Sequence, residues 1–310
     1  MSKSTENLKF TAPEGEIIFP LARVQGDRPG PRVVISAGIH GCEYSSIAAA
    51  IALYQELDPA QLQGSVDIVT IASLKAFESR TPFVCPIDGK NPNRVFPGSP
   101  EGSYTEVLVW RLLHQVISGA DYYLDLHGGD MVERIEPFSL YHVGGDPKVM
   151  ERSRQMAVCY GLPNLIATGD TTDWPDYYTT YANGAKLGVA SIIAECGGIG
   201  QLEEADVATH LRGLRNVLRF TGSLPGAAQS FGPVTVFHDF VWLYSPAAGF
   251  YRHSVAVGDE VEQGQSVGRV EDYFGNLKQE LTAPATGRVL FVTTSPAMPE
   301  KGVILAVGRR

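Results

Sequence analysis

The chain has 310 residues, of which 44% are hydrophobic and 19% are charged, a composition typical of a folded protein rather than a disordered one. The 34 Asp and Glu residues outnumber the 25 Lys and Arg residues, which disfavours a nucleic-acid binder that depends on phosphate contacts. No apolar run approaches the roughly 20 residues of a membrane-spanning helix. The N-terminal sequence MSKSTENLKF lacks the apolar core of a signal peptide, so we expect a cytoplasmic protein.

Predicted strands and helices alternate along the first part of the chain. Apolar, β-branched runs predict strands, and apolar residues at helical spacing predict helices. The predicted strands cover residues 16–24, 32–38, 65–72, 120–126, 138–143, 164–167 and 189–194. The predicted helices cover residues 44–57, 105–118, 147–160, 174–187 and 202–220. This alternation predicts an α/β fold with a mostly parallel sheet flanked by helices.

The pattern changes near residue 222. The sequence TGSLPGAAQSFG is small, polar and rich in turn residues, as is typical of a link between domains. Beyond it, short β-branched runs alternate with Gly, Pro and Asp turns, which predicts a small all-β barrel or sandwich. We therefore expect one domain over residues 1–221 and a second, all-β domain over residues 226–310.

Polar residues follow three predicted strands at the points where the strands end. They are His40 and Glu43, His127, and Glu195, each among glycine or other small residues. Ligands of open α/β sheets bind at these carboxyl ends. Residues three apart on a turn that opens a helix face the same side, so the first pair could reach one ion. With His127 they form a His₂Glu set of the kind found in catalytic zinc sites. Spacing alone leaves a metal site and ordinary hydrogen-bonded histidines equally open.

Other polar residues have two interpretations each. Glu195 ends a very apolar strand, where a carboxylate is costly to bury, so it either forms an ion pair with an arginine or acts as a general base. Asp125 either orients a ligand histidine or caps a neighbouring element. In the long polar stretch 79–102, Arg94 suits a carboxylate and Asn93 can add a hydrogen bond, unless both lie on a solvated loop.

Four motifs in the same order resemble the succinylglutamate desuccinylase/aspartoacylase family, relatives of the zinc carboxypeptidases. They are His40-Gly-Cys-Glu43, Asn93-Arg94-Val-Phe-Pro-Gly, Leu124-Asp-Leu-His127-Gly-Gly and Glu195-Cys-Gly-Gly. The β-rich C-terminal part resembles the barrel-like domain that follows the catalytic domain in that family. The resemblance thus covers nearly the whole chain and implies a zinc-carboxypeptidase-like fold for the first domain.

The resemblance implies a zinc-dependent hydrolase, with one Zn²⁺ per chain, that cleaves the amide bond of a small N-acyl amino acid. Glu195 would be the general base and acid, and Asn93 with Arg94 would hold a carboxylate of the substrate. The implied zinc ligands are His40, Glu43 and His127.

The family also uses an upstream arginine to polarise the scissile carbonyl. Arg80 lies in the right stretch for this role, although many relatives have the arginine nearer the position of Phe83. A second substrate-binding arginine is not evident, since no arginine occurs between Leu165 and Glu195. Tyr177 and Tyr178 occupy that stretch and are our candidate substrate contacts, which leaves room for a neutral or cationic substrate group.

Other functions use the same residues. A zinc carboxypeptidase acting on short peptides would share the ligand set and Glu195, and a non-catalytic metal- or small-molecule-binding protein would need only the ligands. The C-terminal part also resembles biotinyl and lipoyl carrier domains, but Lys278 lacks the setting of a modified lysine. We expect a small-molecule partner, with no nucleic-acid or membrane partner, and a homo-oligomer stays open.

Overall fold

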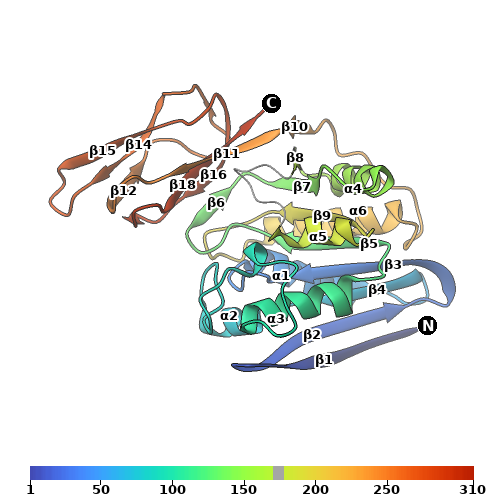
Figure 1. The fold of residues 1–310 in the computed structure, drawn as a ribbon. Coiled ribbons are helices and arrows are strands. Elements are labelled where there is room, and N and C mark those ends of the chain that lie inside the picture. The colour runs from blue at the N-terminus through green and yellow to red at the C-terminus, as the bar shows by residue number, and fades with distance from the viewer. Residues whose placement is uncertain (170–177) are drawn as a thin grey trace.

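The computed structural model describes residues 1–169 and 178–310, so the candidate Tyr177 lies outside the described residues. Within them, the first part of the chain is built on a nine-stranded sheet with the order β1-β2-β4-β3-β5-β9-β7-β8-β10 (Figure 1). Its strands are β1 (Ser2–Ala12), β2 (Gly15–Gln25), β3 (Arg28–Ala37), β4 (Gln63–Val69), β5 (Tyr122–His127), β7 (Phe138–His142), β8 (Asn164–Thr168), β9 (Ala190–Glu195) and β10 (Thr235–Phe237). Its helices are α1 (Tyr44–Glu56), α2 (Leu74–Ser79), α3 (Tyr104–Arg111), α4 (Pro147–Tyr160), α5 (Thr180–Lys186) and α6 (Glu204–Phe220), with the short η1 (Pro92–Arg94) and the π-helical η2 (Leu112–Ile117).

The centre of this sheet is parallel. Strands β4, β3, β5 and β9 run in the same direction, whereas β1, β2 and β7 join as antiparallel neighbours. Successive residues of β3 face opposite sides: Val33 and Ile35 pack in the cluster that includes helices α1, α4 and α6, and Val34 packs in the cluster of α3 and η2. The predicted α/β class, with a mostly parallel sheet covered by helices on both faces, is confirmed.

Strand β1 has no counterpart among the predicted elements. Its sequence, SKSTENLKFTA, is polar over its first six residues and alternates between apolar and polar only from Leu8 to Ala12, and most of its side chains are exposed. It nevertheless pairs with β2 along its whole length, from Ser2 opposite Gln25 to Ala12 opposite Gly15. Main-chain hydrogen bonds to a neighbouring strand place this edge strand, and side-chain patterns do not record them.

The C-terminal part consists of two antiparallel sheets, as the sequence predicts for an all-β region. One contains β11 (Asp239–Tyr244), β18 (Val303–Arg309), β16 (Gly287–Thr293) and β13 (Glu260–Val261). The other contains β15 (Leu277–Thr282), β14 (Ser266–Glu271), β12 (Gly249–His253) and β17 (Ala297–Met298). A separate apolar cluster that includes Val267, Val289 and Leu305 lies between them.

Short strands cross between the two parts. Strand β6 (Glu133–Ile135), which follows the His127 turn, pairs with β16 of the C-terminal sheet. Strand β10 follows the predicted start of the second domain at residue 226 but pairs with β8 of the large sheet. In Figure 1 the orange and red C-terminal strands accordingly adjoin β6 and the upper end of the large sheet. The domain boundaries 1–221 and 226–310 stay a prediction. A strand from each side of the boundary pairs with a sheet on the other side.

Among the described residues, no helix is long and apolar enough to cross a lipid bilayer. The cytoplasmic location and the homo-oligomer stay predictions.

Candidate active site

The predicted site residues meet at one edge of the parallel sheet. His40 follows β3, Glu43 is the residue before the first turn of α1, and His127 and Glu195 are the last residues of β5 and β9. Strands β3, β5 and β9 are neighbours, and His127 stands directly opposite Glu195 in the register. Because parallel strands end together, four residues that lie far apart in the sequence converge on one place.

A glycine permits the tight turn between the first two of these residues. At Gly41, an added Cβ atom would lie 2.2 Å from the backbone nitrogen of Phe77 in helix α2. Only a residue without a side chain fits this approach. The turn therefore presses against α2 and brings His40 and Glu43 to the same side.

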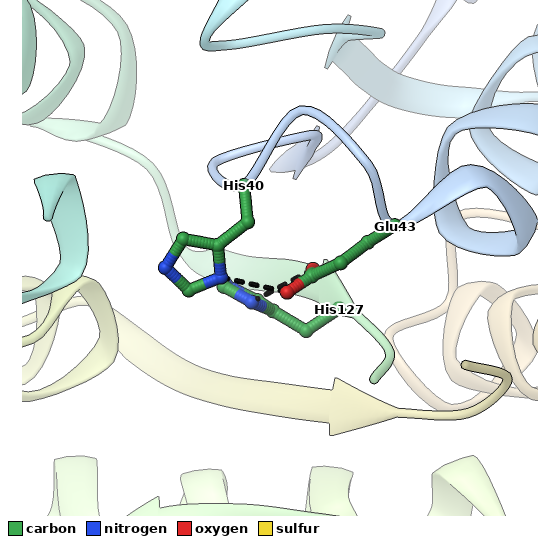
Figure 2. Close-up of side chains that lie close together, drawn as sticks. All are labelled: His40, Glu43 and His127. Carbon is green, nitrogen blue, oxygen red and sulfur yellow. Dashed lines mark hydrogen bonds and ion pairs between the residues drawn. The ribbon is translucent and has the colours of Figure 1, made fainter. Parts of the chain in front are cut away.

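Glu43 lies between the two histidines (Figure 2). Its Oε1 is 2.6 Å from Nδ1 of His40, and its Oε2 is 3.1 Å from Nδ1 of His127. One ligand atom from each of the three residues falls within 4.8 Å of the other two. The structure thus brings the predicted zinc ligands together with their donor atoms facing one another.

The outer nitrogen of each histidine faces an oxygen. Nε2 of His40 lies 3.1 Å from Oδ1 of Asn91, and Nε2 of His127 lies 3.0 Å from Oδ2 of Asp125. Asp125 is in turn held by hydrogen bonds from the hydroxyls of Ser36 and Thr180. Of the two interpretations of Asp125, the structure supports the one in which it orients a ligand histidine.

This arrangement is suited to a cation at its centre. If each Nε2 donates its proton outward, each Nδ1 presents a lone pair to an oxygen of Glu43, and these acceptors repel one another unless a proton or a cation lies between them. Burial alone would lower the pKa of His127, but the Glu43 and Asp125 carboxylates raise it well above its usual value. Burial alone would raise the pKa of Glu43, but the two histidines lower it. A set of two imidazole nitrogens and one carboxylate is therefore suited to a zinc ion.

Glu195 stands beside this set, directly opposite His127 in the strand register. Among the described residues it forms no ion pair with an arginine or lysine and accepts no side-chain hydrogen bond, which removes the interpretation as half of a salt bridge within this part of the chain. Removal from water raises its pKa well above the usual value, and the charge of Glu43 acts in the same direction. A carboxyl group of this kind is suited to accepting and releasing a proton.

A hydrogen-bonded support lies behind Glu195. Nε2 of the fully buried His210, on α6, is 3.2 Å from the carbonyl oxygen of Cys196, and its Nδ1 is 2.7 Å from the hydroxyl of Tyr160. Burial lowers the pKa of His210 to about 4. The neutral imidazole therefore anchors the backbone that follows Glu195, a role that no motif around His210 indicates.

Asn93 and Arg94 line the same cavity as the predicted zinc ligands and Glu195. Oδ1 of Asn93 accepts a hydrogen bond of 3.0 Å from the backbone of Thr180, which leaves the amide NH₂ as the donor for a ligand. Nη1 of Arg94 donates to the Asn93 carbonyl oxygen over 2.7 Å, and Arg94 is exposed to solvent. The predicted carboxylate-binding pair thus lies where a substrate would need it.

Two candidates lie elsewhere. Arg80 is exposed at the end of α2 and does not line this cavity, whereas Phe83 does. Tyr178 is 45% exposed and is also not among the lining residues; its neighbour Thr179 is. The proposed roles of Arg80 in polarising the carbonyl and of Tyr178 in binding substrate stay predictions.

Several lining residues were not anticipated. Asn91 lies in the polar stretch 79–102, but nothing in the sequence pairs it with His40. Glu133 lies on β6, six positions beyond His127 and outside every motif. Phe240, Trp242 and Phe291 come from the C-terminal sheet and form an aromatic wall, with ring centroids 4.8 Å apart for the first two and 5.2 Å apart for the last two. The alternation of Phe240 and Trp242 predicts a shared face of a strand, but not what that face contacts.

Both the sequence and the fold have known relatives. Residues 29–221 match the family model described as the succinylglutamate desuccinylase/aspartoacylase catalytic domain. The chain is 31% identical over 301 residues to the N-alpha-acetyl-L-2,4-diaminobutyric acid deacetylase of Halomonas elongata, a match that covers 94% of this chain and 86% of that protein.

Solved structures share the fold over nearly the whole chain. The product-bound ectoine utilization protein EutE (DoeB) from Ruegeria pomeroyi has a TM-score of 0.88 at 23% identity and covers 100% of this chain and 95% of that one. A succinylglutamate desuccinylase/aspartoacylase from Rhodobacter sphaeroides has a TM-score of 0.85 at 24% identity and covers 98% and 94% of the two chains.

These relatives confirm the resemblance that the four motifs carry. The family match and the deacetylase relative support the predicted activity, a deacylase that cleaves the amide bond of a small N-acyl amino acid or related amide. The chain belongs to the succinylglutamate desuccinylase/aspartoacylase family.

Proposed function

We propose that the protein is a zinc-dependent amidohydrolase that removes the acyl group, in the first instance acetyl, from a small N-acyl amino acid. One observation carries the proposal: a single cavity is lined by a facing His–Glu–His set, by Glu195 and by the guanidinium of Arg94. The relative from Halomonas elongata is named as a deacetylase of a diamino acid, which supports acetyl as the acyl group.

Three side chains would hold the zinc, namely His40, Glu43 and His127. Nitrogen and carboxylate ligands suit zinc, and three protein ligands leave a further position open. When bound, zinc supplies a Lewis acid that makes water a stronger acid and polarises the amide carbonyl. Asn91 and Asp125 would keep the two imidazoles turned toward the ion.

Arg94 and Asn93 would hold the α-carboxylate of the substrate. The guanidinium offers two parallel N–H donors to a carboxylate, and the free amide NH₂ of Asn93 adds a third donor. Such fixed contacts position the amide bond against Glu195 and reduce the entropy that is lost on reaching the transition state.

Glu195 would move the proton that the reaction requires. It takes a proton from the attacking water as the new carbon–oxygen bond forms, and it gives that proton to the nitrogen as the carbon–nitrogen bond breaks. The products are a carboxylic acid and a free amine. The raised pKa of Glu195 suits both steps, because the group must hold the proton between them.

The aromatic wall favours a small substrate. Phe240, Trp242 and Phe291 line the cavity from the C-terminal sheet, whereas a carboxypeptidase acting on peptides needs a cleft that is open to a long chain. The same wall excludes water, which strengthens the electrostatic interactions inside the site.

The experiment is a hydrolysis screen of N-acetyl, N-formyl and N-succinyl amino acids with the zinc-loaded protein, in which the released amine is measured. We expect turnover of at least one N-acetyl amino acid and loss of that turnover when zinc is chelated. Absence of turnover with every compound, by a protein that binds zinc stoichiometrically, would overturn the proposal.

A further inference from the structure

Glu133 is held firmly at the edge of the cavity. Its backbone N–H donates to the carbonyl oxygen of Asp130 over 3.0 Å, and its own carbonyl oxygen accepts from the backbone of Ile199 over 2.9 Å. On the other side it pairs with Thr293 in the ladder between β6 and β16. Glu133 is thus fixed by the turn after His127, by the turn after Glu195 and by the C-terminal sheet.

Among the described residues, only one of the two carboxyl oxygens of Glu133 accepts a hydrogen bond. Its Oε2 accepts a hydrogen bond of 3.0 Å from the backbone of Asp130. Among the described residues its Oε1 accepts no hydrogen bond, and no arginine or lysine forms an ion pair with it. Removal from water raises its pKa to about 8. A carboxyl group in this position gains most from a cation that arrives with the ligand.

The charges around the cavity are unbalanced in the same sense. Three carboxyl groups line it, those of Glu43, Glu133 and Glu195, and among the described lining residues Arg94 is the one permanent cation. A bound zinc would favour the ionised form of these carboxyl groups, and with all three ionised, zinc and Arg94 together would neutralise them. The α-carboxylate of the substrate would then leave one negative charge in excess, which a positive group on the substrate would neutralise.

We propose that Glu133 selects N-acyl amino acids whose side chain carries a positive charge, an inference that rests on the proposed deacylase function. The ammonium group would donate to the free Oε1 of Glu133. The neighbouring Ile135, on the same face of β6, and the ring of Trp242 would cover the methylene groups of the substrate side chain. A neutral side chain would leave the carboxyl group unpaired, and an anionic one would meet repulsion.

Glu133→Gln is the most direct variant, because it removes the charge but keeps an oxygen that can accept the hydrogen bond from Asp130. Glu133→Asp keeps the charge on a shorter side chain and should retain part of the preference. Glu136→Gln is the matched control: it removes a glutamate from the same segment that pairs with Arg288 over 3.2 Å and does not line the cavity. Thermal unfolding of each variant verifies that it is folded.

The experiment compares kcat/KM for two substrates of nearly the same shape. Nα-acetyl-2,4-diaminobutyrate has a positively charged side chain, and Nα-acetylnorvaline has an uncharged one. We expect the wild type and Glu136→Gln to prefer the charged substrate by about 100-fold or more. In Glu133→Gln the value for the charged substrate should fall by about that factor, while the value for the neutral substrate stays within a few-fold. Equal turnover of both by the wild type, or an unchanged preference in Glu133→Gln, would overturn the role of Glu133 and leave the deacylase function intact.

A binding measurement separates this inference from the proposed function. Calorimetric titration of the zinc-loaded protein with free 2,4-diaminobutyrate and with norvaline requires no hydrolysis. Tighter binding of the diamino acid by the wild type, lost in Glu133→Gln, supports the role of Glu133 even if no N-acyl amino acid is hydrolysed. Equal binding of the two amino acids contradicts that role whatever the hydrolysis screen shows.

Discussion

The two walls of the cavity differ in both chemistry and origin. The wall from the α/β part carries the charged groups, His40, Glu43, His127 and Glu195, at the ends of parallel strands and in the turns after them. The wall from the C-terminal part carries aromatic rings on antiparallel strands, among them Trp242. The α/β part would thus supply the reacting groups, whereas the described lining residues of the C-terminal part are all apolar rings, which would lower the local dielectric constant.

The difference follows from how the two kinds of sheet present side chains. At the carboxyl edge of a parallel sheet, loops that are rich in glycine can bring polar residues from several strands to one point. An antiparallel sheet presents every second side chain on one face, so it provides a continuous surface. Strand β6 joins the two walls, because it follows the His127 turn and pairs with β16.

The largest effect should come from removing a ligand from the charged wall. In His127→Ala the proposed zinc site loses one of its three donors, and Glu43 keeps only one imidazole partner. We expect the purified variant to contain little zinc by plasma emission spectroscopy and to show no measurable deacylase activity. Full zinc occupancy in His127→Ala would remove this residue from the ligand set.

Glu195→Gln should abolish most of the catalytic activity without loss of bound zinc. Glu195 is not among the three facing donors, so zinc content should equal that of the wild type. We expect kcat to fall by about 10²–10⁴-fold, since the amide side chain cannot accept and return the proton. A variant with normal kcat would show that Glu195 does not carry the proton.

The apolar wall is tested by Trp242→Ala. Its ring packs against Phe240 and Phe291, and its loss admits water to the cavity without touching a zinc donor. We expect normal zinc content and a fall of about tenfold in kcat/KM. Tyr273→Ala, which removes an aromatic ring that is 83% exposed on the same part of the chain, is the control and should leave kcat/KM unchanged. If Trp242→Ala lost a larger fraction of its zinc than of its activity, Trp242 would support the metal site, and the two walls would not have separate roles.

The smallest effect concerns His210, which supports the backbone after Glu195. We expect it in the free energy of unfolding rather than in turnover. The pKa of His210 is lowered from 6.5 to about 4 in the folded protein, so between these pH values the unfolded chain binds more protons. Stability should therefore fall as the pH falls from 6.5 toward 4, by about 2–3 kcal/mol from this group. His210→Gln should lose that acid sensitivity when thermal unfolding is measured in the presence of a chelator. The exposed His114→Gln controls for loss of a histidine, and an identical acid dependence in all three proteins would contradict the assignment.

Most elements could be predicted because their residues carry short-range patterns. The buried strand β9 (ASIIAE) is almost wholly apolar, and helix α4 repeats apolar residues at helical spacing, so each is recognisable without its neighbours. Strand β1 carries such a pattern only from Leu8 to Ala12, and its polar first half is placed by pairing with β2. The three-residue strand β6 is too short to show a period at all.

By itself, the sequence determined the order of most elements, the zinc-ligand candidates His40, Glu43 and His127, and the place of Glu195, because polar residues among small residues at strand ends are local features. Only the tertiary structure decided which residues complete the site. It turned Asp125 toward His127, brought Glu133 to the cavity and left Arg80 outside it. These positions depend on strand register and on the packing of segments far apart in the chain, and a single sequence does not record such long-range contacts.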